Sequence, residues 1–388
     1  MVSVDSHRPT WAEIDLDALS ENLAAVRRRV GTRPILAVVK ADAYGHGAVG
    51  VARALATEGA EWLGVAIPEE GIELRRAGIR APILVLGGFA PEQAELVLQH
   101  GLVPALFRPD QVEALSLAAG RRGGEAPAHL KVDTGMGRLG IPAAEVPAFA
   151  DFLKEAAGRV RVTGAFSHLA VADDPADPFT RRQIDLFHEA VAALRSRGLP
   201  AGEVHLANSA AIMDHPPAWL TLVRPGIVLY GYHPSSKVTP LPVRPILSLK
   251  TRIIYMKEIS PGTSLGYGRT FIARRRVRVA SLPLGYDDGL PRLASNRGFV
   301  LVRGRRAPIV GRVSMDLTTV DVTDVPGAAL GDQATVIGTS GAESLGADLV
   351  ASWADTISWE ILCRIGSRVP RLYLRGASRE VVSRFGEI

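Results

Sequence analysis

Short apolar runs alternate with amphipathic segments from residue 34 to about residue 230. Each run is almost continuously apolar, which is typical of parallel strands that are buried on both faces. The runs are Pro34–Val39, Trp62–Ile67, Pro82–Leu86, Leu102–Leu106, Ala128–Val132, Val160–Phe166, Glu203–Leu206 and Thr221–Val223. Eight strand–helix units within roughly 200 residues predict an α/β fold, a TIM (β/α)8 barrel. An open doubly wound sheet is the alternative, but no Gly-x-Gly-x-x-Gly follows the first run.

The segments between these runs carry apolar residues at helical spacing. In one of them, the spacing of three, four and three residues links Ile184, Phe187, Val191 and Leu194. A similar segment before the first run carries Leu16, Leu19, Leu23, Val26 and Val30. We therefore expect amphipathic helices between the strands, and another before the first strand.

The pattern changes after about residue 240. Strand-like runs are then separated by Gly, Pro and Asp, which are typical turn residues. These runs are Leu247–Ile254, Val277–Leu282, Gly298–Val302, Leu317–Val322 and Ala334–Ile337. We predict a mostly antiparallel β domain over residues 241–388 that follows the barrel over residues 10–240. Only Leu345–Arg364 has a helical pattern there, and the strand-like segment 9–15 can join the β domain.

Composition narrows the class of protein. The chain has 388 residues, 47% hydrophobic and 22% charged, which fits an ordinary soluble protein of about two domains. Its one cysteine, Cys363, excludes an intrachain disulfide and fits a reducing cytosol. The N-terminus has no basic segment followed by an apolar stretch, and no apolar run is long enough to span a membrane. We expect a cytoplasmic protein without a membrane partner.

The distribution of charge and the spacing of the histidines disfavour a nucleic-acid-binding protein and a metal-binding protein. The net charge is +5, but the short basic runs are scattered and lack interleaved aromatic residues, which disfavours a nucleic-acid partner. The nine histidines include no His-x-His and no His-Glu-x-x-His, so we expect no metal site.

Chemically versatile side chains follow the carboxyl ends of the predicted strands, where barrel enzymes place their active sites. The strand ends carry Lys40 with Tyr44; Lys131 with Asp133 and Arg138; His168; His205 with Asn208 and Ser209; and Arg224 with Gly226 and Ile227. The loops after the last two strands are where this fold commonly holds a phosphate. An amine, a flat imidazole, an arginine and a phosphate cradle together suit pyridoxal phosphate, with an imine to Lys40 and the ring against His168.

Each of these residues also has a purely structural interpretation. Lys40 can extend to solvent from a strand end, and His168 can be a hydrogen-bonded core histidine. Arg224 can pair with a carboxylate, and Ser209 can cap a helix. Their conjunction at one end of the barrel favours the cofactor site.

At these residues the chain closely resembles the alanine racemases, the pyridoxal-phosphate enzymes that interconvert L- and D-alanine. The most specific motif is Val39-Lys40-Ala-Asp-Ala-Tyr44-Gly-His-Gly, and the resemblance runs from Trp11-Ala-Glu-Ile-Asp-Leu to Arg368-Val-Pro-Arg371. It implies a barrel followed by a β domain, a homodimer with shared active sites, and a role in supplying D-alanine for peptidoglycan.

The resemblance also implies roles for individual residues. Lys40 would carry the cofactor and act as one base, and Tyr267 of the partner subunit would be the second base. Arg224 would face the pyridine nitrogen with His205 behind it. The phosphate would be held by Tyr44, Ser209, Gly226 and Ile227, with Asn208 beside them.

Other residues would serve the substrate. Arg138 and the N–H of Met315 would bind its carboxylate, while Tyr286, with Asp288 and Arg292 nearby, would line the access corridor. Asp316 would help to order the side of the active site to which Tyr267 belongs. Lys131 would carry a carbamate or remain unmodified.

One departure keeps other functions open. The resemblance leads us to expect Tyr just before Arg-Val-Pro-Arg, but the chain has Ser367, which is shorter. A racemase of broader specificity is therefore an alternative. A pyridoxal-phosphate decarboxylase and a cofactor carrier are further alternatives, but the lone Cys363 in a helical stretch and the large β domain count against them.

Overall fold

The computed structural model describes residues 8–156, 158–199 and 202–383, and the chain forms two compact units. Unit 1 contains the segment that ends at Ala18, the segment Tyr44–Gly47 and the segment that begins at Pro245. Unit 2 contains Leu19–Ala43 and Ala48–Arg244.

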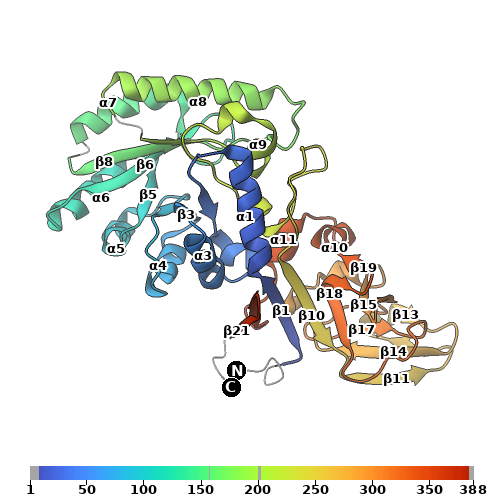
Figure 1. Ribbon diagram of the computed structural model, residues 1–388. Coiled ribbons are helices and arrows are strands. Elements are labelled where there is room, and N and C mark those ends of the chain that lie inside the picture. Colours follow the sequence, from blue (N-terminus) through green and yellow to red (C-terminus); the bar gives the residue numbers. More distant parts are fainter. Residues whose placement is uncertain (1–7, 157, 200–201, 384–388) are drawn as a thin grey trace. The chain divides into compact units, whose positions relative to one another are not determined.

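Unit 2 is built on a parallel sheet with the strand order β2-β3-β4-β5-β6-β8-β9, to which β7 adds beside β6 (Figure 1). The strands are β2 (Leu36–Val38), β3 (Trp62–Val65), β4 (Ile83–Val85), β5 (Val103–Leu106), β6 (Ala126–Asp133), β7 (Ile141–Pro142), β8 (Val160–Phe166) and β9 (Glu203–His205). Along the main path of the sheet, each strand pairs in parallel with the next because the chain returns through a helical connection. The predicted barrel fold is confirmed.

The eighth predicted strand, Thr221–Val223, is not a strand; this prediction was wrong in detail. The segment forms only an isolated parallel bridge between Val223 and Ile35. It is cut short by Leu220, whose φ is 49°, and by Pro225, which has no N–H for a ladder. The segment nevertheless closes the ring, because Val223 O accepts the Leu36 N–H at 2.9 Å and Val204 O accepts the Thr221 N–H at 3.1 Å.

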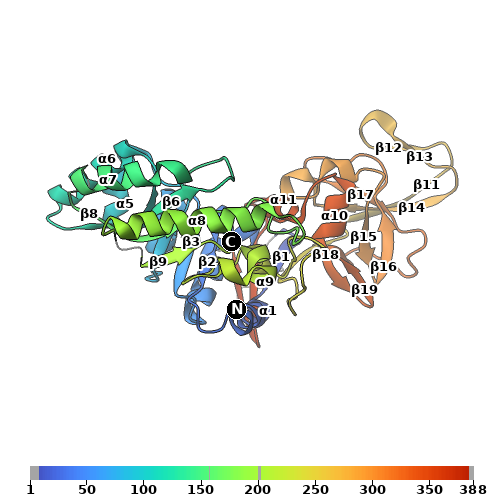
Figure 2. The same cartoon turned by 90° about the horizontal axis from the view of Figure 1, so that it is seen from above.

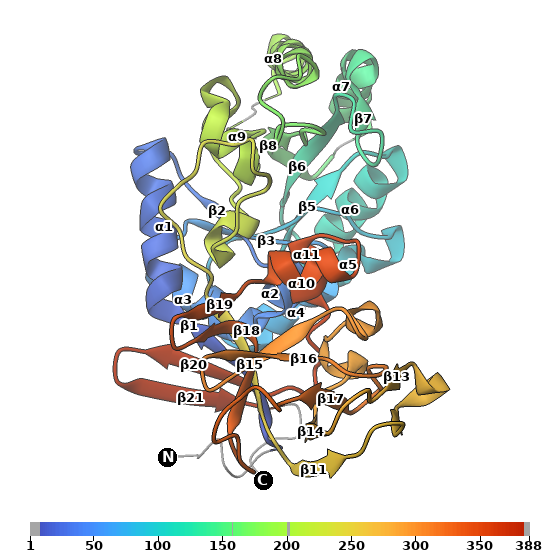
Figure 3. The same ribbon diagram turned by 90° about the vertical axis from the view of Figure 1, so that its right-hand side faces the viewer.

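Helices surround the strands of unit 2 (Figure 3). They are α1 (Leu16–Val30), α3 (Ala48–Thr57), α4 (Pro68–Arg76), α5 (Ala94–Gln99), α6 (Pro109–Arg121), α7 (Val146–Ala156), α8 (Phe179–Ser196) and α9 (Ser209–Asp214). On α8, the predicted apolar stripe from Ile184 to Leu194 is buried, as its helical spacing requires. None of the described helices is both long and apolar enough to cross a membrane.

Unit 1 is mostly antiparallel. Its main sheet has the order β16-β15-β18-β10-β1-β20-β21, with β19 beside β18, and smaller sheets are formed by β11-β14-β17 and by β12-β13 (Figure 2). The strands are β1 (Thr10–Asp15), β10 (Leu247–Arg252), β11 (Tyr255–Ile259), β12 (Ser264–Leu265), β13 (Phe271–Ile272), β14 (Val277–Leu282), β15 (Phe299–Val302), β16 (Arg305–Pro308), β17 (Thr318–Asp321), β18 (Gln333–Ser340), β19 (Glu343–Leu345), β20 (Arg371–Arg375) and β21 (Ser378–Val382). Strand β1 lies between β10 and β20, antiparallel to the first and parallel to the second.

The predicted helix over Leu345–Arg364 is instead two short helices, α10 (Ala347–Trp353) and α11 (Ser358–Cys363). Asp355 between them has a φ of 52°, a left-handed value that a right-handed helix cannot contain. The apolar spacing is therefore shared between two helices rather than carried by one.

Candidate active site

Lys40 stands at the start of an unusual backbone turn, α2 (Lys40–Gly45), which follows β2. The four residues Ala41–Tyr44 have φ angles between 51° and 55°, and Gly45 has a φ of 80°. Left-handed conformations cost non-glycine residues about 1–2 kcal/mol each. In unit 2 the turn is held by Glu70 Oε1, which accepts the Ala41 N–H at 2.6 Å. Strain of this kind is concentrated at functional sites, here directly after the candidate lysine.

Lys131 projects from β6 and is buried. Its Nζ donates to the Leu86 carbonyl at 3.0 Å and lies 5.3 Å from the centre of the Phe166 ring. Burial, together with repulsion from the charges of Arg138, Arg224 and Lys40, lowers the pKa of Lys131 to about 8. Repulsion by these three groups indicates that the basic residues of the strand ends converge.

His168, which follows β8, is surrounded by the same charges. Burial and repulsion from Arg224, Arg138, Lys40 and Lys131 lower the pKa of His168 to about 3. Its imidazole is therefore neutral at physiological pH. The surplus of positive charge around this neutral ring suits an anionic ligand such as a phosphate ester.

Arg224 is buried and held by three acceptors. Its Nη2 donates to the carbonyls of Ser167 at 2.6 Å and Leu206 at 3.1 Å, and its Nη1 donates to His205 Nδ1 at 3.0 Å. Burial lowers the pKa of Arg224 to about 9, which still leaves the guanidinium charged at neutral pH. The structure therefore brings the predicted pair Arg224 and His205 into direct contact.

His129 is a residue of this cluster that the sequence analysis missed. Its Nδ1 lies 2.9 Å from His205 Nε2, so two histidines stand in line behind Arg224. The sequence could have indicated His129, because it lies two residues before Lys131 on β6. Alternate residues of a strand point to one face, so His129 and Lys131 are expected on the same face of the sheet.

Ser209 and Gly226, two residues of the predicted phosphate site, are joined by a hydrogen bond. The Ser209 hydroxyl accepts the N–H groups of Gly226 at 2.9 Å and Val228 at 3.4 Å, where the 3-10 turn η5 (Ile227–Tyr230) begins. Asn208, rather than Ser209, caps α9, because its Oδ1 accepts the Ala211 N–H at 3.0 Å. The helix-cap interpretation of Ser209 is therefore wrong.

Tyr44 belongs to unit 1, where its side chain is buried. Burial and the neighbouring Cys363 raise the pKa of its phenol, so Tyr44 is a neutral hydroxyl that can donate a hydrogen bond. The segment is fixed by Arg371, whose Nη2 donates to the Gly45 carbonyl at 2.8 Å.

Tyr267, also in unit 1, is 71% exposed. It begins the 3-10 turn η6 (Tyr267–Arg269) and stands between Gly266 and Gly268, whose φ angles are 69° and 71°. Two left-handed glycines present the phenol on a tight, projecting turn. An aromatic side chain that exposed within one chain is free to serve another binding partner.

Tyr286 and Arg292 border a cavity of about 330 Å³ in unit 1, together with Gly289, Pro291 and Arg364. Tyr286 begins the 3-10 turn η7 (Tyr286–Asp288), and Arg292 begins η8 (Arg292–Ala294). Met315 is 52% exposed in the same unit.

Asp288 is fully buried and anchors the Tyr286 turn. It accepts hydrogen bonds from Arg8 Nη1 at 2.5 Å, Arg368 Nε at 2.8 Å and the Gly285 N–H at 2.9 Å. Asp316 lies 2.7 Å from Arg368 Nη1, and these carboxylates raise the pKa of Arg368. Within the described ranges, no group of His, Cys, Asp and Glu is arranged to hold a metal ion.

The chain matches known proteins over nearly its whole length. Residues 14–234 match the N-terminal domain of alanine racemase, and residues 246–373 match its C-terminal domain. The chain is 48% identical over 373 residues to the alanine racemase of Symbiobacterium thermophilum, which spans 96% of this chain and 99% of that relative.

Solved structures agree with this match. The chain resembles alanine racemase from Bacillus anthracis with bound L-Ala-P, at a TM-score of 0.92 and 35% identity over 98% of this chain and 99% of the other. It also resembles alanine racemase from Bartonella henselae with covalently bound pyridoxal phosphate, at a TM-score of 0.85 and 32% identity over 94% and 99%. These similarities confirm the resemblance seen in the sequence motifs: the chain belongs to the alanine racemase family, whose members are isomerases.

Proposed function

We propose that this protein interconverts L- and D-alanine with pyridoxal phosphate as its cofactor. The observation that carries the proposal is the fixed, charged Arg224 of unit 2. His205 contacts its guanidinium, and its charge helps to lower the pKa values of Lys131 and His168. Membership of the alanine racemase family and the relative with covalently bound pyridoxal phosphate support it.

The residues of the site fit this cofactor. Lys40 would hold it covalently, and the Ser209 hydroxyl with the backbone of Gly226 and Ile227 would receive its phosphate. Tyr44 and Asn208 would complete the phosphate site, and His168, held neutral, would pack against the ring without adding charge. When bound, pyridoxal phosphate supplies an electron sink that makes the Cα–H bond of an amino acid acidic.

Arg224 would set the strength of that sink. A guanidinium donates a hydrogen bond but does not readily release its proton, so the pyridine nitrogen facing it would stay unprotonated. An unprotonated ring withdraws electrons less strongly, which suits a racemase that must return the proton to the same carbon.

Racemisation needs one proton carrier on each face of Cα. Lys40 Nζ would serve one face, and the Tyr267 phenol of the partner subunit would serve the other. The 71% exposure of Tyr267 within its own chain supports a role in completing a second copy's site. We therefore propose a homodimer with shared active sites.

The substrate carboxylate would be bound by Arg138 and by the N–H of Met315. Tyr286 and Arg292 would line the access corridor, and Asp316 would act through its ion pair with Arg368. The expected setting is the cytoplasm, where the product would serve peptidoglycan synthesis.

A deuterium experiment tests the proposal. The purified protein is incubated with pyridoxal phosphate and L-alanine in deuterated water, and the products are separated by chiral chromatography with mass detection. D-alanine that carries deuterium at Cα is expected. Racemisation of serine or lysine instead would favour the broader-specificity racemase suggested by Ser367, and release of carbon dioxide would favour a decarboxylase.

Lys131 is expected to carry a carbamate. Only a neutral amine adds carbon dioxide, and a pKa of about 8 leaves a large fraction of Nζ neutral at pH 8. The carbamate would place a negative charge among Lys40, Arg138 and Arg224. We expect a carbamate resonance in the 13C NMR spectrum of protein kept in 13C-bicarbonate, and its disappearance in Lys131→Met. A wild-type spectrum without the resonance would mean an unmodified lysine.

A further inference from the structure

The hydrogen bonds behind Arg224 have a fixed direction. A guanidinium carries only donors, so His205 Nδ1, at 3.0 Å from Arg224 Nη1, accepts with its lone pair. Burial and the charge of Arg224 hold the pKa of His205 well below its ordinary value, so its imidazole is neutral. The single ring proton of His205 is therefore on Nε2.

The same reasoning fixes the next histidine. His205 Nε2–H donates to His129 Nδ1 at 2.9 Å, so His129 Nδ1 is an acceptor. Burial, together with the charge of Arg224, lowers the pKa of His129 to about 3, and a neutral His129 carries its proton on Nε2. Both tautomers follow because arginine cannot accept a hydrogen bond and because both rings are neutral.

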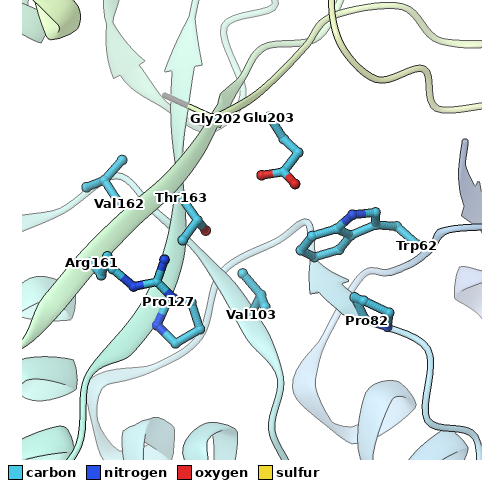
Figure 4. A pocket seen from close by; sticks show the side chains of 9 residues that line it. All are labelled: Trp62, Pro82, Val103, Pro127, Arg161, Val162, Thr163, Gly202 and Glu203. Carbon is cyan, nitrogen blue, oxygen red and sulfur yellow. The ribbon is translucent and has the colours of Figure 1, made fainter. Parts of the chain in front are cut away.

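The row of contacts from Arg224 through His205 to His129 ends at the amino-terminal side of the barrel strands. His129 Nε2 is buried and has no hydrogen-bond partner among the described residues, but it lies 4.0 Å from Glu203 Oε2. Glu203, the first residue of β9, lines a cavity of about 530 Å³ together with Trp62 and Thr163 (Figure 4). A distance of 4.0 Å is too long for a direct hydrogen bond, so the carboxylate would act on the His129 Nε2–H by electrostatic attraction.

Neighbouring residues hold His129 in this place. Its ring packs between Trp62 and His205, with ring centres 5.3 Å and 5.1 Å apart. Gly164 on β8 makes room for it, because a Cβ at that position would come within 2.6 Å of the His129 ring.

Arg224 has no carboxylate partner of its own in the described part of the chain; its hydrogen bonds go to two carbonyls and to His205. We propose that His129 and Glu203 are positioning residues. Together with His205 they form a row of polar contacts that links the Arg224 guanidinium to the Glu203 carboxylate at the opposite end of the barrel strands. Every N–H of the row points away from Arg224. Hydrogen bonds in such a series polarise one another, so Glu203 acts as a remote counter-charge.

The row fixes orientation and does not conduct protons, because its first member, Arg224, keeps its proton at neutral pH. Its effect on catalysis rests on the proposed function, since it would act through Arg224 on the cofactor ring. The row itself can be tested without any catalytic activity.

The first test reads the tautomers directly. Long-range 1H–15N NMR spectra are recorded on the full-length protein with its cofactor and 15N-labelled histidine, and the two rings are assigned with His129→Gln and His205→Gln. We expect both to be neutral with the proton on Nε2. An Nδ1-protonated or doubly protonated ring at either position would overturn the row, whatever the activity of the protein.

The second test removes the carboxylate. Glu203 is 37% exposed at its side chain, so Glu203→Gln should fold normally. We expect a shift of the His129 Nε2 resonance and a fall in kcat of about tenfold with KM unchanged, the lower end of what loss of an outer partner costs at metal sites. Glu125→Gln is the matched control, because Glu125 is an exposed carboxylate that pairs with Arg161, which lines the same cavity. Unchanged kcat in Glu203→Gln, or an equal effect of Glu125→Gln, would overturn the proposal.

The third test separates position from packing. His129→Asn keeps an acceptor near the place of Nδ1, whereas His129→Leu leaves the His205 N–H without one. We expect His129→Leu to shift the absorption maximum of the bound cofactor and His129→Asn to return it toward that of the wild type. Equal behaviour of the two variants would show that His129 only fills space.

Discussion

Tyr267→Phe is expected to lower racemisation by roughly 10²- to 10⁴-fold, the usual contribution of one acid–base group, while the cofactor stays bound. The substitution removes only the hydroxyl that would carry the proton on one face of Cα. Because the side chain is 71% exposed, the free energy of unfolding should not change measurably. Steady-state rates in both directions and the visible absorption of the cofactor check the prediction.

The control for this variant is Tyr255→Phe, since Tyr255 is a 55% exposed tyrosine on β11 of the same unit. It should leave both rates unchanged. A further signature is expected in deuterated water, where Tyr267→Phe should still exchange the Cα proton of one enantiomer, because Lys40 remains on its face. Full activity of Tyr267→Phe would end the two-base assignment.

Lys40→Ala is expected to abolish racemisation and covalent cofactor attachment together. The variant lacks the one amine that we place at the carbonyl carbon of the cofactor, so reduction with borohydride should no longer add the mass of the cofactor to the chain. Lys257→Ala, at an exposed lysine of β11, is the control and should retain both properties. A cofactor still linked to the chain in Lys40→Ala would show that another lysine is the anchor.

The barrel could be predicted because each of its strands is a short apolar run bounded by turn residues. The prediction failed at Thr221–Val223, where Pro225 and the left-handed Leu220 leave a single bridge in place of a strand. In unit 1, β16 (Arg305–Pro308) has two arginines and a proline and shows no strand pattern. It becomes a strand because it pairs with β15, and the local sequence of a segment does not predict such pairing.

In the candidate site, too, some features could be predicted from the sequence and others could not. The convergence of Lys131, His168 and Arg224 was predictable because the carboxyl ends of parallel strands meet at one edge. His129 was missed because it stands within an apolar run and reads as part of the core. The turn after Lys40 could not be predicted either, since Ala41–Tyr44 carry side chains that disfavour positive φ angles. Gly45 is the one residue of the turn whose type favours a positive φ angle.

The position of β1 in the sheet of unit 1 has a consequence for how the chain is made. Ala12 pairs with Leu249 on one side and with Arg371 on the other, so β1 leaves the ribosome long before β20, its second neighbour, has been made. At about 5–20 residues per second, the interval between β1 and β20 is on the order of tens of seconds. During that time Thr10–Asp15 is an unpaired strand edge, the kind of segment that recruits wrong partners. The late arrival of β20 therefore makes β1 the edge of this sheet that is most exposed to mispairing while the chain is being made.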